Sequence, residues 1–117
     1  RLGIDHQSLK EVNSKIITCS ISGFGDTEVN RPAYDNLIQG YAGAMSITGS
    51  DKENPVNSGI PIADLGAGLY AVIGILSGIQ SREKNDSGEH VDISMLDTQV
   101  SLLTYMATMH FLSGRES

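Results

Sequence analysis

The chain has 117 residues, of which 39% are hydrophobic and 19% are charged, a composition typical of a folded domain and not of a disordered or fibrous chain. The formal net charge is -6 and no run of Lys or Arg occurs, which argues against a protein that binds nucleic acid or an anionic membrane. The single cysteine, Cys19, excludes an intrachain disulfide and predicts a buried thiol in a reducing compartment.

No basic-then-apolar signal segment is found, and we expect no apolar stretch that approaches the length needed to span a bilayer. We therefore expect a cytoplasmic protein, or one of the mitochondrial matrix or peroxisome in a eukaryote. The chain begins at Arg1 in the middle of a pattern and without an initiator Met, so we expect N-terminal sequence to be missing. Apolar helices with few charges on so small a chain predict contacts with further protein.

The first part of the chain predicts an α-then-β unit. Residues 2–13 have the pattern of a short amphipathic helix, and residues 15–21 (KIITCSI) have the β-branched density of a buried strand. The glycines of residues 22–26 (SGFGD) then predict a loop at the carboxyl end of that strand, where open α/β sheets bind their ligands. The segment lacks the G-x-G-x-x-G spacing of a dinucleotide-binding loop.

The middle of the chain predicts a helix followed by a surface loop. Asn30-Arg31-Pro32 is a turn or helix-entry signal, and residues 34–44 carry apolar residues at helical spacing. Residues 48–55 are polar and rich in turn formers. Nothing here forces a domain boundary, so we expect residues 1–117 to form a single partial domain.

A long helix is predicted to begin just after Asp64 and to run to about Glu83. Its large apolar residues are spaced for one face, and Gly66, Gly74 and Gly78 form a second ridge. Glycine inside a helix costs stability unless another part of the protein approaches closely, so this ridge predicts tight packing or ligand contact. Residues 90–95 then alternate as a strand and residues 96–112 predict a last helix, which gives an α/β fold class.

Two carboxylates are candidates for chemistry. Asp64 directly precedes the predicted long helix, and on position alone a plain N-cap is the favoured interpretation. The small residues 66–68 that follow would leave room for a substrate to reach the carboxylate. Asp35, beside Tyr34, has a similar structural interpretation as a first-turn acid of its own helix.

Other sites are not supported. The three histidines, His6, His90 and His110, are far apart in the sequence and lack metal-ligand spacing, so no metal site is expected. No G-x-S-x-G elbow surrounds Ser20 or Ser22, so no serine nucleophile is expected. From the residues alone, the sequence predicts an α/β chain with a possible carboxylate site.

Four segments together resemble the class III CoA-transferase family, which includes formyl-CoA transferase, the carnitine and succinyl-CoA-linked transferases, and α-methylacyl-CoA racemase. They are residues 20–25 with 31–35 (SISGFG, RPAYD), 45–49 (MSITG), 60–70 (IPIADLGAGLY) and 88–97 (GEHVDISMLD). Their order and spacing extend the resemblance over nearly the whole chain. It implies part of the family fold, a Rossmann-like CoA-binding domain with a linking region, and an interlocked homodimer in the full-length protein.

The resemblance also implies a mechanism. In the family, the aspartate that matches Asp64 attacks an acyl-CoA to give a mixed anhydride, freed CoA converts this to an enzyme thioester, and an acceptor acid reverses the steps. Covalent steps of this kind split one difficult displacement into easier ones. The resemblance implies no cofactor or metal beyond the CoA thioester, which is a substrate, with small carboxylic acids as the other partners. The residues implied to contact substrate or CoA are Arg1, Leu2, Tyr34, Asp35 and Met95.

Two alternatives stay open. Racemases of the family use a histidine where this chain has Tyr34, and a phenol is a poor substitute because phenols ordinarily ionise only near about pH 10. Transfer is therefore favoured over racemisation. The other alternative is a non-catalytic α/β interaction domain in which Asp64 is only a helix cap. The resemblance also implies that segments needed for activity lie outside this chain, so the chain alone is expected to be inactive.

Overall fold

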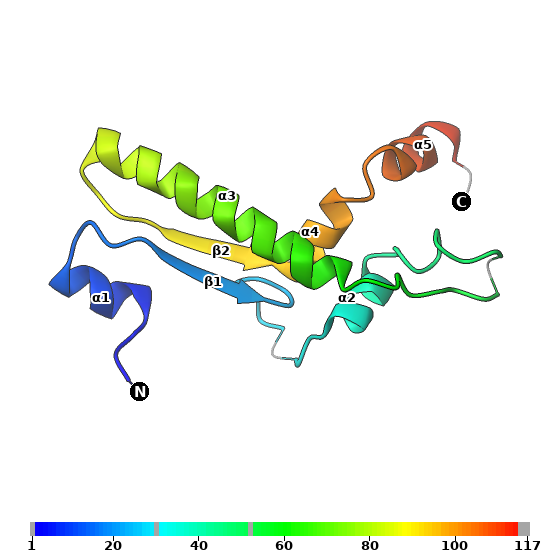
Figure 1. Cartoon of the computed structure of the whole chain (residues 1–117), viewed down its shortest axis with the longest axis horizontal. Coiled ribbons are helices and arrows are strands. Elements are labelled where there is room, and N and C mark those ends of the chain that lie inside the picture. The colour runs from blue at the N-terminus through cyan, green and yellow to red at the C-terminus, as the bar shows by residue number, and fades with distance from the viewer. Residues whose placement is uncertain (1, 30, 52, 115–117) are drawn as a thin grey trace.

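The computed structural model describes residues 2–29, 31–51 and 53–114, and these form an elongated molecule of 54 × 32 × 25 Å with five helices and two strands (Figure 1). The elements in chain order are α1 (His6–Val12), β1 (Thr18–Ser22), α2 (Asp35–Tyr41), α3 (Ile62–Asn85), β2 (His90–Ser94), α4 (Met95–Ser101) and α5 (Tyr105–Ser113). Helix α3 extends along the sheet, with α1 near one end of the molecule and α5 near the other. The α/β class predicted from the sequence is confirmed.

The two strands form a parallel pair. Their register runs from Thr18 opposite His90 to Ser22 opposite Ser94, so both strands end at the same edge of the sheet. The predicted strand 15–21 is displaced by a few residues, because only residues 18–22 belong to the ladder. The chain between the strands contains α2 and α3, the kind of long crossover that a parallel pair needs.

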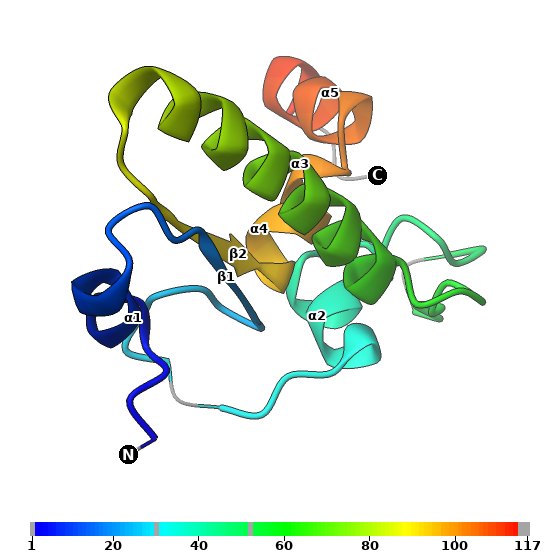
Figure 2. The ribbon, with the colours of Figure 1, turned by 60° about the vertical axis from the view of Figure 1, so that its left-hand side comes forward.

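Helix α3 packs against the sheet and α4 through its small residues. A Cβ atom placed on Gly74 would lie 2.6 Å from Cγ1 of Val91 in β2, and one placed on Gly66 would lie 3.0 Å from Cγ2 of Thr98 in α4. Gly78 faces Ile17 in the segment before β1. The glycine ridge is thus a packing surface, and the prediction of tight packing is confirmed. Figure 2 shows α3 lying over the two strands.

The large apolar residues of α3 lie on the opposite, exposed side. Their side chains are 55–67% exposed, and we call this face the apolar stripe of α3; its members are Leu65, Leu69, Val72, Ile73 and Leu76. The helix is long and apolar enough to cross a membrane by length and composition, with a mean hydropathy of 1.8, so the expectation that no such stretch exists was wrong. The hydropathy is high because the packing face consists of small uncharged residues and the exposed stripe of large apolar ones, while the basic residues Arg82 and Lys84 lie in the last turn. A helix that packs on a sheet can meet the same criterion, and it is weak evidence for a membrane span.

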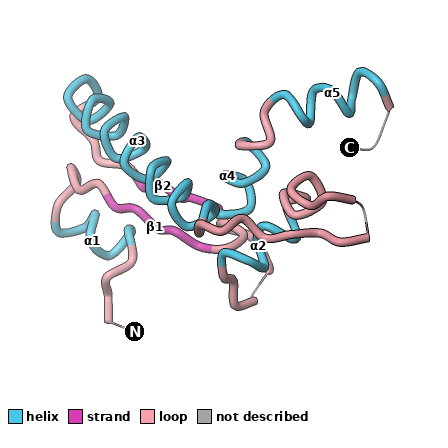
Figure 3. Tube along the Cα trace, turned by 45° about the vertical axis from the view of Figure 1, so that its right-hand side comes forward, coloured by secondary structure: helices cyan, strands magenta, loops and turns pink. Residues whose placement is uncertain are grey.

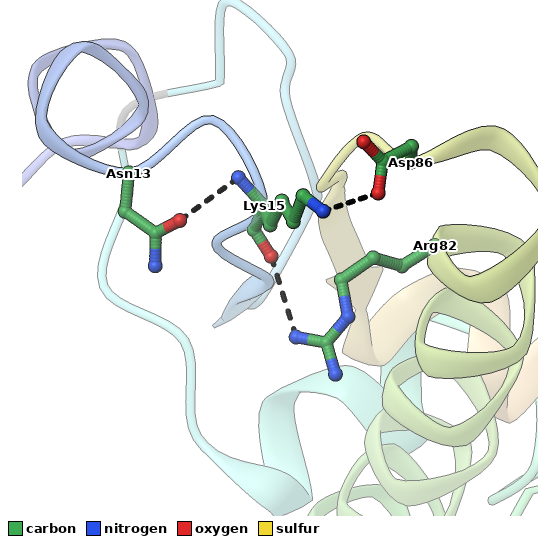
Figure 4. Close-up of polar contacts among 4 residues, drawn as sticks. All are labelled: Asn13, Lys15, Arg82 and Asp86. Carbon is green, nitrogen blue, oxygen red and sulfur yellow. Dashed lines mark hydrogen bonds and ion pairs between the residues drawn. The ribbon is translucent and has the colours of Figure 1, made fainter.

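The far end of α3 is tied to the segment before β1 (Figure 4). Lys15 forms an ion pair with Asp86, its backbone N–H donates to Oδ1 of Asn13 (3.0 Å), and its carbonyl accepts from Nη1 of Arg82 (3.3 Å). Exposed ion pairs stabilise little, typically about 0–1 kcal/mol. The backbone bond from Gly88 N to Ser14 O (2.9 Å) is the more direct tie between the two approaches to the sheet.

The core lies at the other end of α3. Ile38 of α2, Ala63 and Ala67 of α3, and Met95 of α4 form its buried centre, and partly buried residues pack around them: Phe24, Ala33, Ile93 and Leu96. Figure 3 shows α2 next to the start of α3. The first turn of α3 is therefore held by the core.

The last helix differs from the prediction. Residues 96–112 form two helices, α4 and α5, separated by a break at residues 102–104. The N–H of Leu102 is shared between the carbonyls of Thr98 (3.1 Å) and Gln99 (3.2 Å), and Thr104 has a positive φ of 45°. No glycine or proline marks this point, so the helical pattern continued through it in the sequence.

The chain between α2 and α3 is a loop, as predicted for residues 48–55. Helix α2 ends at Tyr41, before Gly43, which has a φ of 78°. Within the loop, Oδ1 of Asp51 accepts from the side chain of Asn54 (2.8 Å) and from the N–H groups of Glu53 and Asn54. The hydrogen bond from the Asn54 side chain is the main cause that lowers the pKa of Asp51.

Candidate active site

Helix α3 begins before Asp64. Its N-cap is Pro61, which makes no side-chain cap hydrogen bond, and Asp64 is the third helical residue. The prediction that Asp64 is the N-cap is therefore wrong. The helix starts earlier because the N–H of Ile62 bonds to the Ile60 carbonyl (2.8 Å) and the N–H of Leu65 to the Pro61 carbonyl (3.0 Å).

The cap of α3 comes from another helix. Oδ1 of Asp35 accepts from the N–H of Ala63 (2.8 Å) and, more weakly, from the N–H of Asp64 (3.4 Å). Asp35 lies in the first turn of α2, as predicted. Its role as the cap of α3 could not be seen in the sequence, because Ala63 and Asp64 are 28 and 29 residues away from Asp35.

A buried glutamine holds Asp35 in place. Nε2 of Gln39 donates to Oδ2 of Asp35 (2.6 Å), and Oε1 of Gln39 accepts from the N–H of Ser58 (2.9 Å). Gln39 is 1% exposed. Sequence reasoning missed this residue, although its position four residues after Asp35 on a helix was a usable signal.

The Asp64 side chain is exposed, and within the part of the chain that the structure describes its carboxylate accepts no hydrogen bond. Of the small residues that follow, Gly66 and Ala67 are buried in packing, whereas a Cβ on Gly68 would meet nothing within 4 Å. The room predicted beside Asp64 thus exists at Gly68 and not at Gly66.

The other predicted contacts are spread over the molecule. Tyr34 is the N-cap residue of α2 and is 68% exposed, next to Asp35 and hence close to the start of α3. Leu2 is 89% exposed and precedes α1 in the chain, and α1 lies away from α2 (Figures 1 and 2). Met95 is 8% exposed in the core, with little surface for a ligand. Arg1 lies outside the described residues.

The loop after β1 covers the carboxyl ends of both strands. Oδ2 of Asp92 accepts from the N–H of Asp26 (2.7 Å), and Oδ1 accepts from the Ser20 hydroxyl (2.7 Å). Gly25 has a φ of 70°, and a Cβ there would lie 3.3 Å from Oδ2 of Asp92. The loop predicted at the carboxyl end of the strand is confirmed, and the side chains of Asp92 and Ser22 both accept hydrogen bonds from its backbone.

Two hollows lie around α2, α4 and α5. One, of about 600 Å³, is lined by residues of the loop after β1, α2 and α4: Phe24, Glu28, Val29, Arg31, Tyr41 and Leu96. The other, of about 550 Å³, is mostly apolar and lies between the turns after α2 and helix α5. Neither is lined by Asp64, so this carboxylate lies on an open surface of the chain.

Within residues 2–29, 31–51 and 53–114, no group of three His, Cys, Asp or Glu side chains is placed to hold a metal ion. Two histidines that are far apart in the sequence do meet. The Thr18 hydroxyl bridges Nδ1 of His6 (2.8 Å) and Nδ1 of His90 (2.8 Å), and the two rings lie 5.4 Å apart. The Thr18 hydroxyl thus links His6 at the start of α1 to His90 in β2.

The fold and the site define an α/β segment in which the first turn of α3 carries an exposed aspartate, Asp64, and is capped by Asp35 of α2. The sequence profile of CoA-transferase family III matches residues 1–117, and the chain belongs to this family. Among curated proteins, it is 36% identical over 117 residues to a succinate–glutarate CoA-transferase of Agrobacterium fabrum, covering 98% of this chain and 29% of the relative. It is 32% identical to the human succinyl-CoA:glutarate CoA-transferase, covering 99% of this chain and 27% of that protein.

A solved structure agrees with the sequence relationship. A CaiB/BaiF family protein from Brucella suis superimposes with a TM-score of 0.93 and 38% identity, covering 98% of this chain and 31% of that one. The predicted family and fold are confirmed. The chain spans less than a third of the length of each of these proteins.

Proposed function

We propose that the whole protein exchanges coenzyme A between an acyl-CoA and a free carboxylic acid, with Asp64 as the residue that carries the acyl group. The observation that supports this most is the exposed Asp64 carboxylate, which has no hydrogen-bonding role among the described residues. The expected capping role belongs to Asp35 instead. A carboxylate fixed on a helix and free of structural partners is suited to act as a nucleophile.

The reaction balances without an oxidant, reductant or ATP. An Asp64 oxygen attacks the thioester carbonyl carbon, the C–S bond breaks, and CoA leaves as a thiolate, which gives a mixed anhydride. The thiolate then attacks the aspartyl carbonyl carbon, so the donor acid leaves as a carboxylate and an enzyme thioester forms. The acceptor carboxylate reverses both steps. Each intermediate is an activated acyl group, so the energy of the thioester is kept.

Small mono- or dicarboxylic acids are the proposed substrates, and no cofactor is needed for this chemistry. The names of the relatives support this class, since they describe transfer to or from glutarate, succinate and oxalate. Arg1 and Leu2 stay proposed CoA contacts, and Tyr34 a proposed substrate contact. We also propose that the full-length protein is a homodimer in the cytoplasm.

A racemase is the less favoured reaction. Proton abstraction beside a thioester needs a base near neutral pH, and the exposed residue beside the candidate site is Tyr34. A purely interacting domain is also less favoured, because its main support was a capping role for Asp64. The apolar stripe of α3 does favour a protein contact, which a homodimer would also provide.

Trapping tests the proposal. The full-length protein is incubated with an acyl-CoA such as succinyl-CoA, treated with hydroxylamine, and digested for peptide mass analysis. We expect a modified peptide at Asp64, and CoA exchange that falls by orders of magnitude in Asp64→Asn. A trapped adduct at another residue, or normal exchange by this variant, would reject the assignment.

A further inference from the structure

We propose that Asp35 is a positioning residue for Asp64: its carboxylate fixes the first turn of α3, and with it the direction in which the Asp64 side chain leaves the helix. The inference rests on the proposed function of Asp64. It assigns Asp35 a role toward the helix and not toward the substrate, because its two oxygens already face the donors of Ala63 and Gln39.

The start of α3 depends on this carboxylate. The first and fourth N–H groups of the helix bond to backbone carbonyls of residues 60 and 61. The second and third, of Ala63 and Asp64, both point to Oδ1 of Asp35. Ala63 is 0% exposed, so water could not replace Asp35 at its N–H group. Without Asp35, the turn that carries Asp64 would have to rearrange.

Gln39 gives Asp35 a single orientation. The N–H of Ser58 is a donor, so it must meet the oxygen Oε1 of Gln39, which leaves Nε2 to donate to Asp35. Because Gln39 is buried, the amide has no other partners available to it. The chain of bonds therefore joins α2, the loop before α3, and the residue next to the nucleophile.

Such a tie matters for the proposed attack. An aspartate has a short side chain, so the place of its carboxylate follows the backbone closely. Bond formation needs reacting atoms about 3–3.5 Å apart and aligned, and a displacement of about 1 Å can cost about 100-fold in rate. We therefore expect Asp35 to affect the acylation rate of Asp64 more than the binding of acyl-CoA.

A reciprocal exchange in the full-length protein provides the test. In Asp35→Asn, the new NH₂ group faces the NH₂ group of Gln39, so the bond between the two side chains is lost. If the Gln39 amide turns over to restore that bond, its NH₂ group faces the N–H of Ser58 and the bond to Ser58 is lost instead. Gln39→Glu alone sets two carboxylates against each other. In Asp35→Asn with Gln39→Glu, the asparagine donates to the glutamate and the other glutamate oxygen accepts from Ser58, so every bond is restored.

We expect each single variant to lower kcat for CoA exchange by about 10- to 100-fold, with KM for acyl-CoA changed by less than about threefold. The double variant should recover most of the loss. Gly74→Ala is the matched control: Gly74 lies in the same helix as Asp64, about 15 Å further along its axis, and the added Cβ would meet Val91 of β2. It should lower the melting temperature without lowering kcat.

The outcomes separate the two proposals. If the wild-type protein forms an adduct on Asp64 and Asp35→Asn forms it equally fast, the positioning role is wrong and the nucleophile stands. A double variant as slow as the single variants, with a melting temperature that has recovered, also overturns it. If the wild-type protein forms no adduct on Asp64, the proposed function fails and the inference fails with it.

Discussion

At the scale of single residues, the cap of α3 and the proposed nucleophile are two different aspartates, Asp35 and Asp64, whereas the sequence pattern had offered Asp64 for both roles. Position alone favoured Asp64 as the N-cap because an acid followed by a helical pattern is a common cap. The structure starts the helix at Ile62, behind Pro61, and takes the cap from Asp35. Local sequence could not reveal this, since the bond joins residues 28 apart. Stability and reactivity should therefore separate at these positions.

Substitutions at Asp64 should consequently leave the fold almost intact. Asp64→Asn and Asp64→Ala should each change the free energy of unfolding by no more than about 1 kcal/mol, since an exposed first-turn acid is worth about 0.3–1 kcal/mol. Both should lower CoA exchange by orders of magnitude in the full-length protein. Chemical denaturation and an exchange assay measure the two effects. A marked loss of stability in Asp64→Ala but not in Asp64→Asn would show that the Asp64 side chain does cap the helix.

Asp35 should show the opposite balance. Asp35→Ala leaves the buried N–H of Ala63 without its partner, and the loss of an N-cap acceptor typically costs about 0.5–2 kcal/mol. We expect this variant to be less stable than Asp64→Ala in the same denaturation experiment. Equal stability of the two variants would mean that the Asp35 bond contributes little.

At the scale of elements, the sequence predicted what local patterns determine. The long helix, the strand at residues 90–95, the loop after β1 and the glycine ridge were all found close to their predicted places. The break between α4 and α5 was missed because Thr104 takes a positive φ without a glycine to signal it. The spacing of the large apolar residues of α3 was visible in the sequence, but the pattern alone could not show that this face stays uncovered within the chain.

Two glycines of α3 test this packing directly. Gly74→Ala places a Cβ 2.6 Å from Val91, and overpacking of this kind costs about 1–3 kcal/mol. Gly68→Ala meets nothing within 4 Å and should stabilise the helix by up to about 1 kcal/mol, because alanine is the better helix former. Thermal melts of the two variants should shift in opposite directions. A shift in the same direction would contradict the packing described for α3.

At the scale of the whole molecule, the apolar stripe of α3 is the feature that this chain leaves uncovered. Five large apolar side chains more than half exposed on one helix form a contiguous surface of the kind that marks protein contacts. The chain spans less than a third of the length of its relatives. We therefore expect this face to be covered by further protein.

The 117-residue chain expressed alone should therefore associate through this face. Leu69→Lys with Leu76→Lys would place two charges in the stripe, and because both side chains are at least 60% exposed, the chain's own packing should be little affected. We expect the unmodified chain to show a mass in light scattering that rises with concentration, and the double variant to stay closer to a monomer. A matched control, Arg82→Gln with Lys84→Gln, alters charge at the end of the same helix and should leave association unchanged. If the Leu69 and Leu76 variant still associates, the contact lies elsewhere, such as the hollow beside α5. If the unmodified chain is a well-behaved monomer, the stripe needs no partner.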